Sequence, residues 1–412
     1  MPSTRNNLRH LAFFEELATH DENEPEWHAG TAGLVALRLV DHWVEDGKKV
    51  TADTFGVKAV RGAIDKIDDG TPIKAILGSV VDGMATGKKP RPRDVTPRLM
   101  AYAKALEYDA KWALAADVYE CVLGHTHPLE ERDLAITAHL QRGFCFRTLG
   151  DLDAAMEAYS AAGTIAESVQ DMMGILRARI GDAKVAVARG NLPYAERVLD
   201  ETIEQATIHG VPDARYRALH DRAYVAHQRG QYALSVQFAY DALRGAPDQL
   251  ARDRVLNDLG GAFYMLGIRS AARDAYLVLA ATAQEQYTRW SALISLMGIA
   301  ADDGMAPLFE RYRRELSAAT LPPLLEVHFY IHAGVAYHRF REVDSAVGYL
   351  ERAVVAARRY SLNQLLSEAE QHLEDVTTRV STAAVVESPA PEELVPIVDL
   401  VRDLRERAEA TT

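Results

Sequence analysis

The spacing of apolar side chains predicts helices along nearly the whole chain. Leu8, Leu11, Phe14 and Leu17 follow one another at three-residue steps, as on one face of a helix. Residues 31–45 are apolar on almost every face, which predicts a helix buried among other helices. Long runs of Val, Ile and Thr, which favour strands, are rare. The pattern therefore predicts an all-α protein.

Residues 1–96 contain about four such helices, two of them around Phe55 and Ile64 and over residues 73–84. We interpret this N-terminal helical module either as a small bundle or as diverged copies of the repeat that follows it. No second helix shows the polar face that a DNA-reading helix-turn-helix needs, so nucleic acid is not an expected partner. Residues 88–93, a basic run broken by two prolines, predict a solvated hinge.

Residues 97–360 repeat a pattern of side-chain sizes. The clearest copy reads small, bulky, turn, small, aromatic and small, at Gly143, Phe146, Gly150, Ala155, Tyr159 and Ala162. Aligned copies place their turn residues at Ala110, Gly150, Gly190, Gly230, Gly267, Gly304 and Arg341. The steps between these positions are 40, 40, 40, 37, 37 and 37 residues, and the copy around Gly304 is the least regular. Such regular spacing predicts seven consecutive repeats.

A repeated pair of helices explains this pattern. One pair cannot bury its apolar face alone, so neighbouring pairs stack and share a continuous core. Small residues let two helices approach closely, and the bulky positions fill the space between repeats. We therefore expect five aromatic side chains to be core rather than part of a cofactor site: Phe146, Tyr159, Phe263, Tyr276 and Tyr337.

The pattern resembles the tetratricopeptide-repeat (TPR) superfamily over residues 97–360. A TPR unit is a helix pair of about 34 residues, and the longer steps seen here are similar to those of long-repeat bacterial proteins. The resemblance implies a right-handed TPR-like α–α solenoid of about seven helix pairs after the N-terminal helical module. The layout is also similar to that of bacterial Rap-like regulators, in which a solenoid binds a short peptide.

The resemblance further implies a concave groove lined by the first helix of each repeat. The groove positions carry basic and aromatic side chains in this sequence: Arg177, Lys184, Arg217, His220, Tyr224, His227, Arg254, Asn257, Tyr264, His328, His332 and His338. Arginines can pair carboxylates, and an asparagine amide can both donate to and accept from a peptide backbone. We expect an acidic peptide or protein segment in the groove. The alternative is that these cations pair with acids of the same chain, such as Asp221 and Asp258.

These features predict a non-enzymatic scaffold or adaptor that binds a protein or peptide in the groove. The alternative is a peptide-responsive intracellular regulator whose solenoid controls the N-terminal module. Both leave open whether the chain forms an oligomer.

The end of the chain predicts two further helices. One covers residues 361–380, and residues 381–391 are a linker. Residues 392–412 form an acidic amphipathic helix, with Leu394 and Ile397 on its apolar face. This C-terminal helix either caps the solenoid or occupies the basic groove, in its own chain or a neighbour's.

Catalytic and metal-binding motifs fail in detail. Residues 83–88 fall one residue short of a phosphate-binding loop. Residues 65–76 begin like a calcium loop, but Ile76 occupies the position of the required glutamate. His328, His332 and His338 lack a fourth ligand in register. We expect no catalytic residue, no metal and no cofactor.

Charge and composition narrow the class of protein. The net charge of −13 does not suit a general nucleic-acid coat. Cys121 and Cys145 are expected to be small buried side chains, and His125 and His127 to be solvated in an inter-repeat loop. No window approaches the ~18 apolar residues of a membrane span, and the N-terminus lacks the apolar region of a signal peptide. We expect a cytoplasmic protein.

Overall fold

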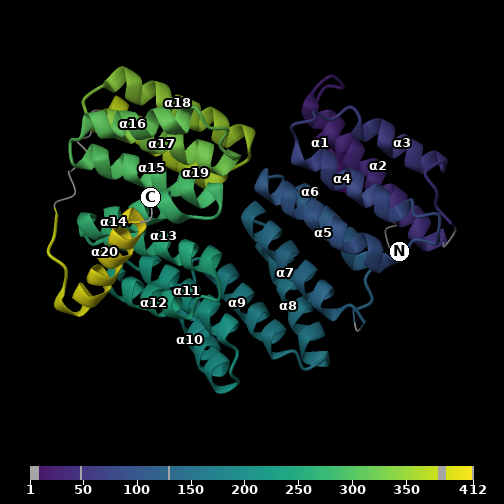
Figure 1. Cartoon of the computed structure of the whole chain (residues 1–412), viewed down its shortest axis with the longest axis horizontal. Coiled ribbons are helices and arrows are strands. Elements are labelled where there is room, and N and C mark those ends of the chain that lie inside the picture. Colours follow the sequence, from purple (N-terminus) through teal and green to yellow (C-terminus); the bar gives the residue numbers. More distant parts are fainter. Residues whose placement is uncertain (1–8, 47–48, 129, 379–386, 411–412) are drawn as a thin grey trace, which may run out of the picture. The chain divides into compact units, whose positions relative to one another are not determined.

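The structure, a computed structural model, describes residues 9–46, 49–128, 130–378 and 387–410, without the side chains of 44–46. These residues form twenty α-helices and one 3-10 helix and contain no strand, which confirms the predicted all-α class (Figure 1). Within the described residues, no helix is long and apolar enough to cross a membrane. The chain divides into an N-terminal unit, Met1–Asn191, and a C-terminal unit, Leu192–Thr412.

The N-terminal unit begins with the four helices expected in its first part. They are α1 (Leu11–Thr19), α2 (Pro25–Asp46), α3 (Phe55–Ile64) and α4 (Pro72–Met84). Leu8 lies outside the described residues. The middle of α2 is buried at Leu37 and Val40, as its all-round apolar pattern predicts. These helices share one core with the first helices of the repeat region.

Five longer helices complete the N-terminal unit: α5 (Pro92–Tyr108), α6 (Trp112–Gly124), α7 (Arg132–Leu149), α8 (Leu152–Ser168) and α9 (Met172–Ala188). The first repeat was expected to begin after Pro97, but α5 begins at Pro92 and contains Pro97. Proline suits the first helical position, where the amide has no intrahelical partner, so Pro92 can start the helix. Only residues 88–91 of the basic segment therefore remain outside a helix.

The C-terminal unit continues the helix pairs: α10 (Leu192–Ile208), α11 (Pro212–Gln228), α12 (Tyr232–Gly245), α13 (Gln249–Met265), α14 (Arg269–Thr282), α15 (Gln286–Asp302), α16 (Ala306–Ser317), α17 (Pro323–Arg339) and α18 (Val343–Arg359). It ends with α19 (Asn363–Thr377), the 3-10 helix η1 (Glu392–Leu394) and α20 (Val395–Glu409). Most of the predicted linker, residues 381–386, lies outside the described residues.

The seven predicted turn residues all have positive φ, which confirms the repeat frame. Five are glycines, which adopt this conformation readily. The other two, Ala110 at 57° and Arg341 at 64°, adopt it despite their side chains. At each turn the chain leaves one helix and starts the next within three or four residues, and the pairs that lie within one unit form tight hairpins.

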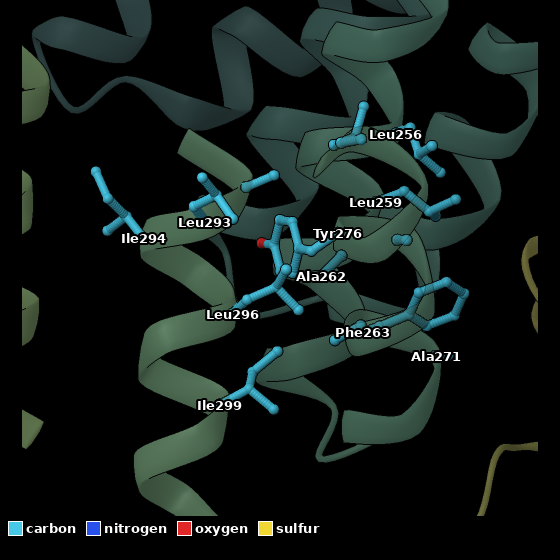
Figure 2. Packing of buried hydrophobic residues seen from close by; sticks show 14 of the residues in the cluster. Leu256, Leu259, Ala262, Phe263, Ala271, Tyr276, Leu293, Ile294, Leu296 and Ile299 are labelled. Carbon is cyan, nitrogen blue, oxygen red and sulfur yellow. The ribbon is translucent and has the colours of Figure 1, made fainter. Parts of the chain in front are cut away.

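Close approach between helices follows the small positions of the repeat. In the C-terminal unit, Tyr276 of α14 lies between α13 and α15 and packs among apolar side chains of both (Figure 2). Gly260 of α13 makes this possible, because a Cβ there would lie 2.8 Å from the Tyr276 ring. Gly143 meets Tyr159 in the same way in the N-terminal unit.

Four of the five aromatic side chains predicted as core are buried: Tyr159, Phe263, Tyr276 and Tyr337. The prediction for Phe146 is wrong in part. Its ring is half-buried and lines a cavity of the N-terminal unit, with the Arg142 guanidinium 5.0 Å from the ring centroid. The rest of the ring packs against the core of the same unit.

The C-terminal helix takes neither of the two places considered for it within its own chain. α20 packs on α14, a second helix in the middle of the array, and η1 lies beside α12. Leu394, Ile397 and Val401 join the core there, and Arg405 lies 3.4 Å from Asp274. The helix therefore neither caps the last pair nor covers the first helices of its own chain. The apolar face of η1 and α20 is buried because it packs into the core formed with α12 and α14.

Candidate functional site

The predicted groove residues fall on the first helices of the repeats. Arg177 and Lys184 lie half-buried on α9 of the N-terminal unit. The other ten lie on α11, α13 and α17 of the C-terminal unit. We call the surface formed by α11, α13, α15 and α17 the first-helix face.

Polar side chains connect successive helices of the first-helix face. His220 Nε2 on α11 lies 2.7 Å from Asp258 Oδ2 on α13. From α13 to α15, the Ser291 hydroxyl donates to Asn257 Oδ1 at 3.2 Å, and the Tyr264 hydroxyl donates to Asp302 Oδ2 at 2.5 Å. The structure therefore brings together residues that the sequence separates by about one repeat.

Asp302 is the most buried member of this series. Its side chain is fully buried, and its second oxygen forms an ion pair with Arg339 on α17. Burial, together with the hydrogen bond to Asp302, raises the pKa of Tyr264 to about 12, so the phenol stays a donor at neutral pH. The Asp302 carboxylate is shielded from water, and an uncompensated buried charge is costly. It therefore needs both the Tyr264 hydroxyl and the Arg339 guanidinium.

The two exposed arginines predicted for the groove have acidic partners on the same face. Arg217 Nε donates to Asp213 Oδ2 at 2.8 Å along α11, and Arg254 lies 3.8 Å from Glu285. His220 pairs with Asp258, as the alternative interpretation of the groove residues predicts. The face carries charges of both signs, and the binding role of its residues stays a prediction.

The histidines of the face differ in their surroundings. Burial lowers the pKa of His227, whose ring meets Tyr232 edge-on. Burial also lowers the pKa of His328. Burial lowers the pKa of His332 to about 3, and nearby positive groups such as Arg339 act in the same direction. His332 faces Gly298 of α15. His328 and His332 are therefore neutral packing groups at pH 7, whereas His338 is half-buried at the end of α17.

Neutral burial of His332 predicts a pH-dependent loss of stability. The unfolded chain protonates this residue below about pH 6.5, whereas the folded chain does so only near pH 3. The folded state should therefore lose about 1 kcal/mol from this residue as the pH falls from 7.5 to 5.5. His332→Gln should remove that part of the pH dependence, measured by hydrogen exchange of α17 amides at both pH values. An equal pH dependence in variant and wild type would contradict it.

Sequence reasoning missed a cluster of titratable groups in the N-terminal unit. His10, Asp41, Asp117 and Cys121 line one cavity of about 740 Å³. His125, expected to be solvated, is buried instead, and its Nε2 lies 2.7 Å from Asp41 Oδ1. The four-residue spacing of 117 and 121 on α6 and 125 just after it was the available signal. The sequence could not show that His10 and Asp41 belong to this cluster, because they lie far from α6 along the chain and only the fold brings them together.

Strong interactions within this cluster shift several pKa values. Burial disfavours a charged His10, but hydrogen bonds with Asp117 and Asp41 outweigh it and raise its pKa to about 9. Burial opposes ionisation of Asp41 as well, but hydrogen bonds with His10 and His125 hold its pKa well below the usual range. Burial and the nearby Asp41 raise the pKa of the Cys121 thiol. Both cysteines are buried, as predicted.

No family model matches the sequence, and no curated protein matches it either. Solved structures with similar arrangements of helices include a Rap protein complexed with competence and sporulation factor, at 11% identity and a TM-score of 0.47, covering 84% of this chain and 98% of that one. A tetratricopeptide-repeat protein from Parabacteroides merdae has 13% identity and a TM-score of 0.36, covering 82% and 99%. A signal-transduction ATPase with a tetratricopeptide-repeat sensor, from Pyrococcus horikoshii, has 10% identity and a TM-score of 0.39, covering 94% and 56%.

The decisive observation is internal to the chain. Helix hairpins recur at the predicted steps, each with a left-handed turn residue, and in several of them a small residue of the first helix faces a large one of the second. The fold is a TPR-like α–α repeat. This TPR-like array supplies the first-helix face, whereas the cavity of the N-terminal unit is lined by α1 and α2 together with helices of the first repeats.

Proposed function

We propose that the protein is an interaction scaffold that binds a segment of another protein on the first-helix face of its C-terminal unit. The observation that carries this proposal is the series of polar side chains running from α11 to α17. Fixed donors and acceptors on neighbouring helices suit an extended peptide, whose backbone presents both. Tyr224 on α11, exposed at 46%, adds apolar area with a polar tip.

The acidic character of the partner is the finer part of this proposal. Arg217 and Arg254 are exposed, and their acidic partners are partly exposed as well. An acidic ligand would compete with Asp213 and Glu285 for these guanidinium groups. Exchanging one exposed ion pair for another costs little folding energy, since such pairs contribute at most about 1 kcal/mol.

Site-specific photocrosslinking in cells tests both parts. A photoreactive phenylalanine in place of Tyr224 should capture a partner, and the same residue in place of Val355, exposed on the second helix α18, should not. Adding Arg217→Glu and Arg254→Glu should abolish capture at 224, while the melting temperature stays nearly unchanged. Asp258→Lys with Glu285→Lys should strengthen it if the partner is acidic.

The outcomes separate the alternatives. Equal capture at 224 and 355 would place binding away from the first-helix face. If capture at 224 survives Arg217→Glu and Arg254→Glu, the protein is still a scaffold, but its ligand is not acidic. For the regulator alternative, the captured ligand should change hydrogen exchange in α1 to α4, whereas a scaffold should leave those helices unaffected.

A further inference from the structure

Three ligand-type atoms converge in the N-terminal unit. They come from His10 at the start of α1, Asp41 on α2 and Cys121 on α6. All three atoms lie within 4.8 Å of one another. His10 Nε2 is 3.0 Å from one Asp41 oxygen, Oδ2, and Cys121 Sγ is 3.5 Å from the other, Oδ1, so a single Asp41 oxygen would have to turn toward both to ligate one ion. Ligand atoms around a tetrahedral zinc ion are roughly 3.3–3.6 Å apart, given bonds of about 2.0–2.3 Å.

The three side chains are held in place and shielded from bulk water. The His10 and Cys121 side chains are almost fully buried, and Asp41 is largely buried. His10 adopts a left-handed backbone conformation, with φ 66° and ψ 42°, which few residues other than glycine take. That conformation turns the imidazole between α2 and α6. Strained backbone conformations of this kind are concentrated at active sites and ligand-binding sites, where the surrounding structure holds them in place.

A second layer of groups orients the three ligands. His10 Nδ1 lies 3.3 Å from Asp117 Oδ1, so the imidazole can donate there and leave its Nε2 lone pair for an ion. This carboxylate–histidine arrangement accompanies most histidine metal ligands. Asp41 accepts from His125 at 2.7 Å. The other Asp117 oxygen is buried and has no hydrogen-bond partner within the described part of the chain, on a side chain exposed by only 10%.

The three ligand residues and Asp117 border the cavity of about 740 Å³, whereas His125 does not line it. A three-ligand site beside such a space keeps its fourth position open, as zinc sites that take a water or a substrate do. Asp41 and an ionised Cys121 would together balance a divalent ion. The ion would take the place of the proton now shared between His10 and Asp41, and the Cys121 proton would leave to solvent.

We propose that His10, Asp41 and Cys121 form a zinc-type metal site, with Asp117 and His125 as positioning residues and a fourth coordination position open to the cavity. The mixed nitrogen, oxygen and sulfur donor set favours zinc over magnesium or calcium, which prefer oxygen alone. This site lies in the N-terminal unit and is independent of peptide binding on the first-helix face.

Cobalt substitution of the full chain tests the site directly. Wild-type protein titrated with Co²⁺ should develop a thiolate-to-cobalt charge-transfer band that saturates at one equivalent, and Zn²⁺ should displace it. Cys121→Ser should lose the band. Cys145→Ser is the matched control, because Cys145 is also buried beside a carboxylate, with its sulfur 4.0 Å from Glu107, and it should keep the band.

The positioning residues give a graded test. Asp117→Asn should weaken Co²⁺ binding about 10–100-fold while keeping the band shape. The wild-type titration needs no variant to fold. Absence of a saturable thiolate band in wild-type protein, or a band lost with Cys145 and kept without Cys121, would overturn the proposal and leave an ion-pair cluster. Binding with unchanged affinity in Asp117→Asn would remove Asp117 from the site.

Discussion

Asp302→Ala should destabilise the C-terminal unit by about 2–4 kcal/mol. The Asp302 side chain is fully buried, accepts from Tyr264 on α13 and pairs with Arg339 on α17. Its removal leaves a largely buried guanidinium without its anion, and breaking a buried pair from one side typically costs about 3–5 kcal/mol. The partial exposure of Arg339 reduces that figure. Urea denaturation, with hydrogen exchange to locate the loss in α13, α15 and α17, measures it.

Asp258→Ala is the matched control on the same face. Asp258 also joins two first helices, through His220, but its side chain is 47% exposed. Exposed pairs of this kind contribute about 0–1 kcal/mol. Asp302→Asn should lie between the two, because the amide still accepts from Tyr264 but carries no charge. If both alanine variants cost the same, Asp302 does not hold the first helices together.

Gly260→Ala should cost about 2 kcal/mol, although alanine favours helices more than glycine does. The new Cβ would lie 2.8 Å from the Tyr276 ring, which Figure 2 shows enclosed between α13 and α15. Overpacking of this kind costs about 1–3 kcal/mol. The ring cannot move aside, because apolar side chains of both helices surround it.

The adjacent glycine provides the control. A Cβ at Gly261 would meet only the Tyr276 hydroxyl, at 3.7 Å, which is an ordinary contact. Gly261→Ala should therefore gain up to about 1 kcal/mol from helix propensity. The two variants should differ by about 2–3 kcal/mol in the free energy of unfolding, measured by urea denaturation. Similar values for both would mean that the close approach of α13 and Tyr276 does not limit packing.

The repeat was predictable because its constraints are local. Turn residues need positive φ and small residues must face large ones, and both leave a mark at fixed spacing, as at Gly260 and Tyr276. Helix starts were less certain, since Pro92 and Pro97 both suit a first turn. The position of α20 could not be predicted, because an amphipathic stripe requires a partner and does not say which one.

The candidate sites were predictable only in part. The repeat frame identified residues on neighbouring first helices, such as Asn257 and Tyr264, but not their pairing with Ser291 and Asp302. These hydrogen bonds depend on how far each side chain extends toward the first helix of the next repeat. A repeat consensus describes positions within one repeat and does not include that distance. The cluster around His10 depends on how the N-terminal helices meet α6, a contact between segments about a hundred residues apart.

The return of α20 to α14 affects how the chain folds during its synthesis. Each hairpin of the array needs only its neighbours, so helices can fold in order as they leave the ribosome. Val401 and Arg405, however, complete the packing of α14 from about 120 positions further along the chain. Until α20 has been synthesised, the apolar surface of α12 and α14 stays uncovered. A chaperone that recognises exposed apolar helices would meet its substrate in that interval, and premature termination would make the exposure permanent.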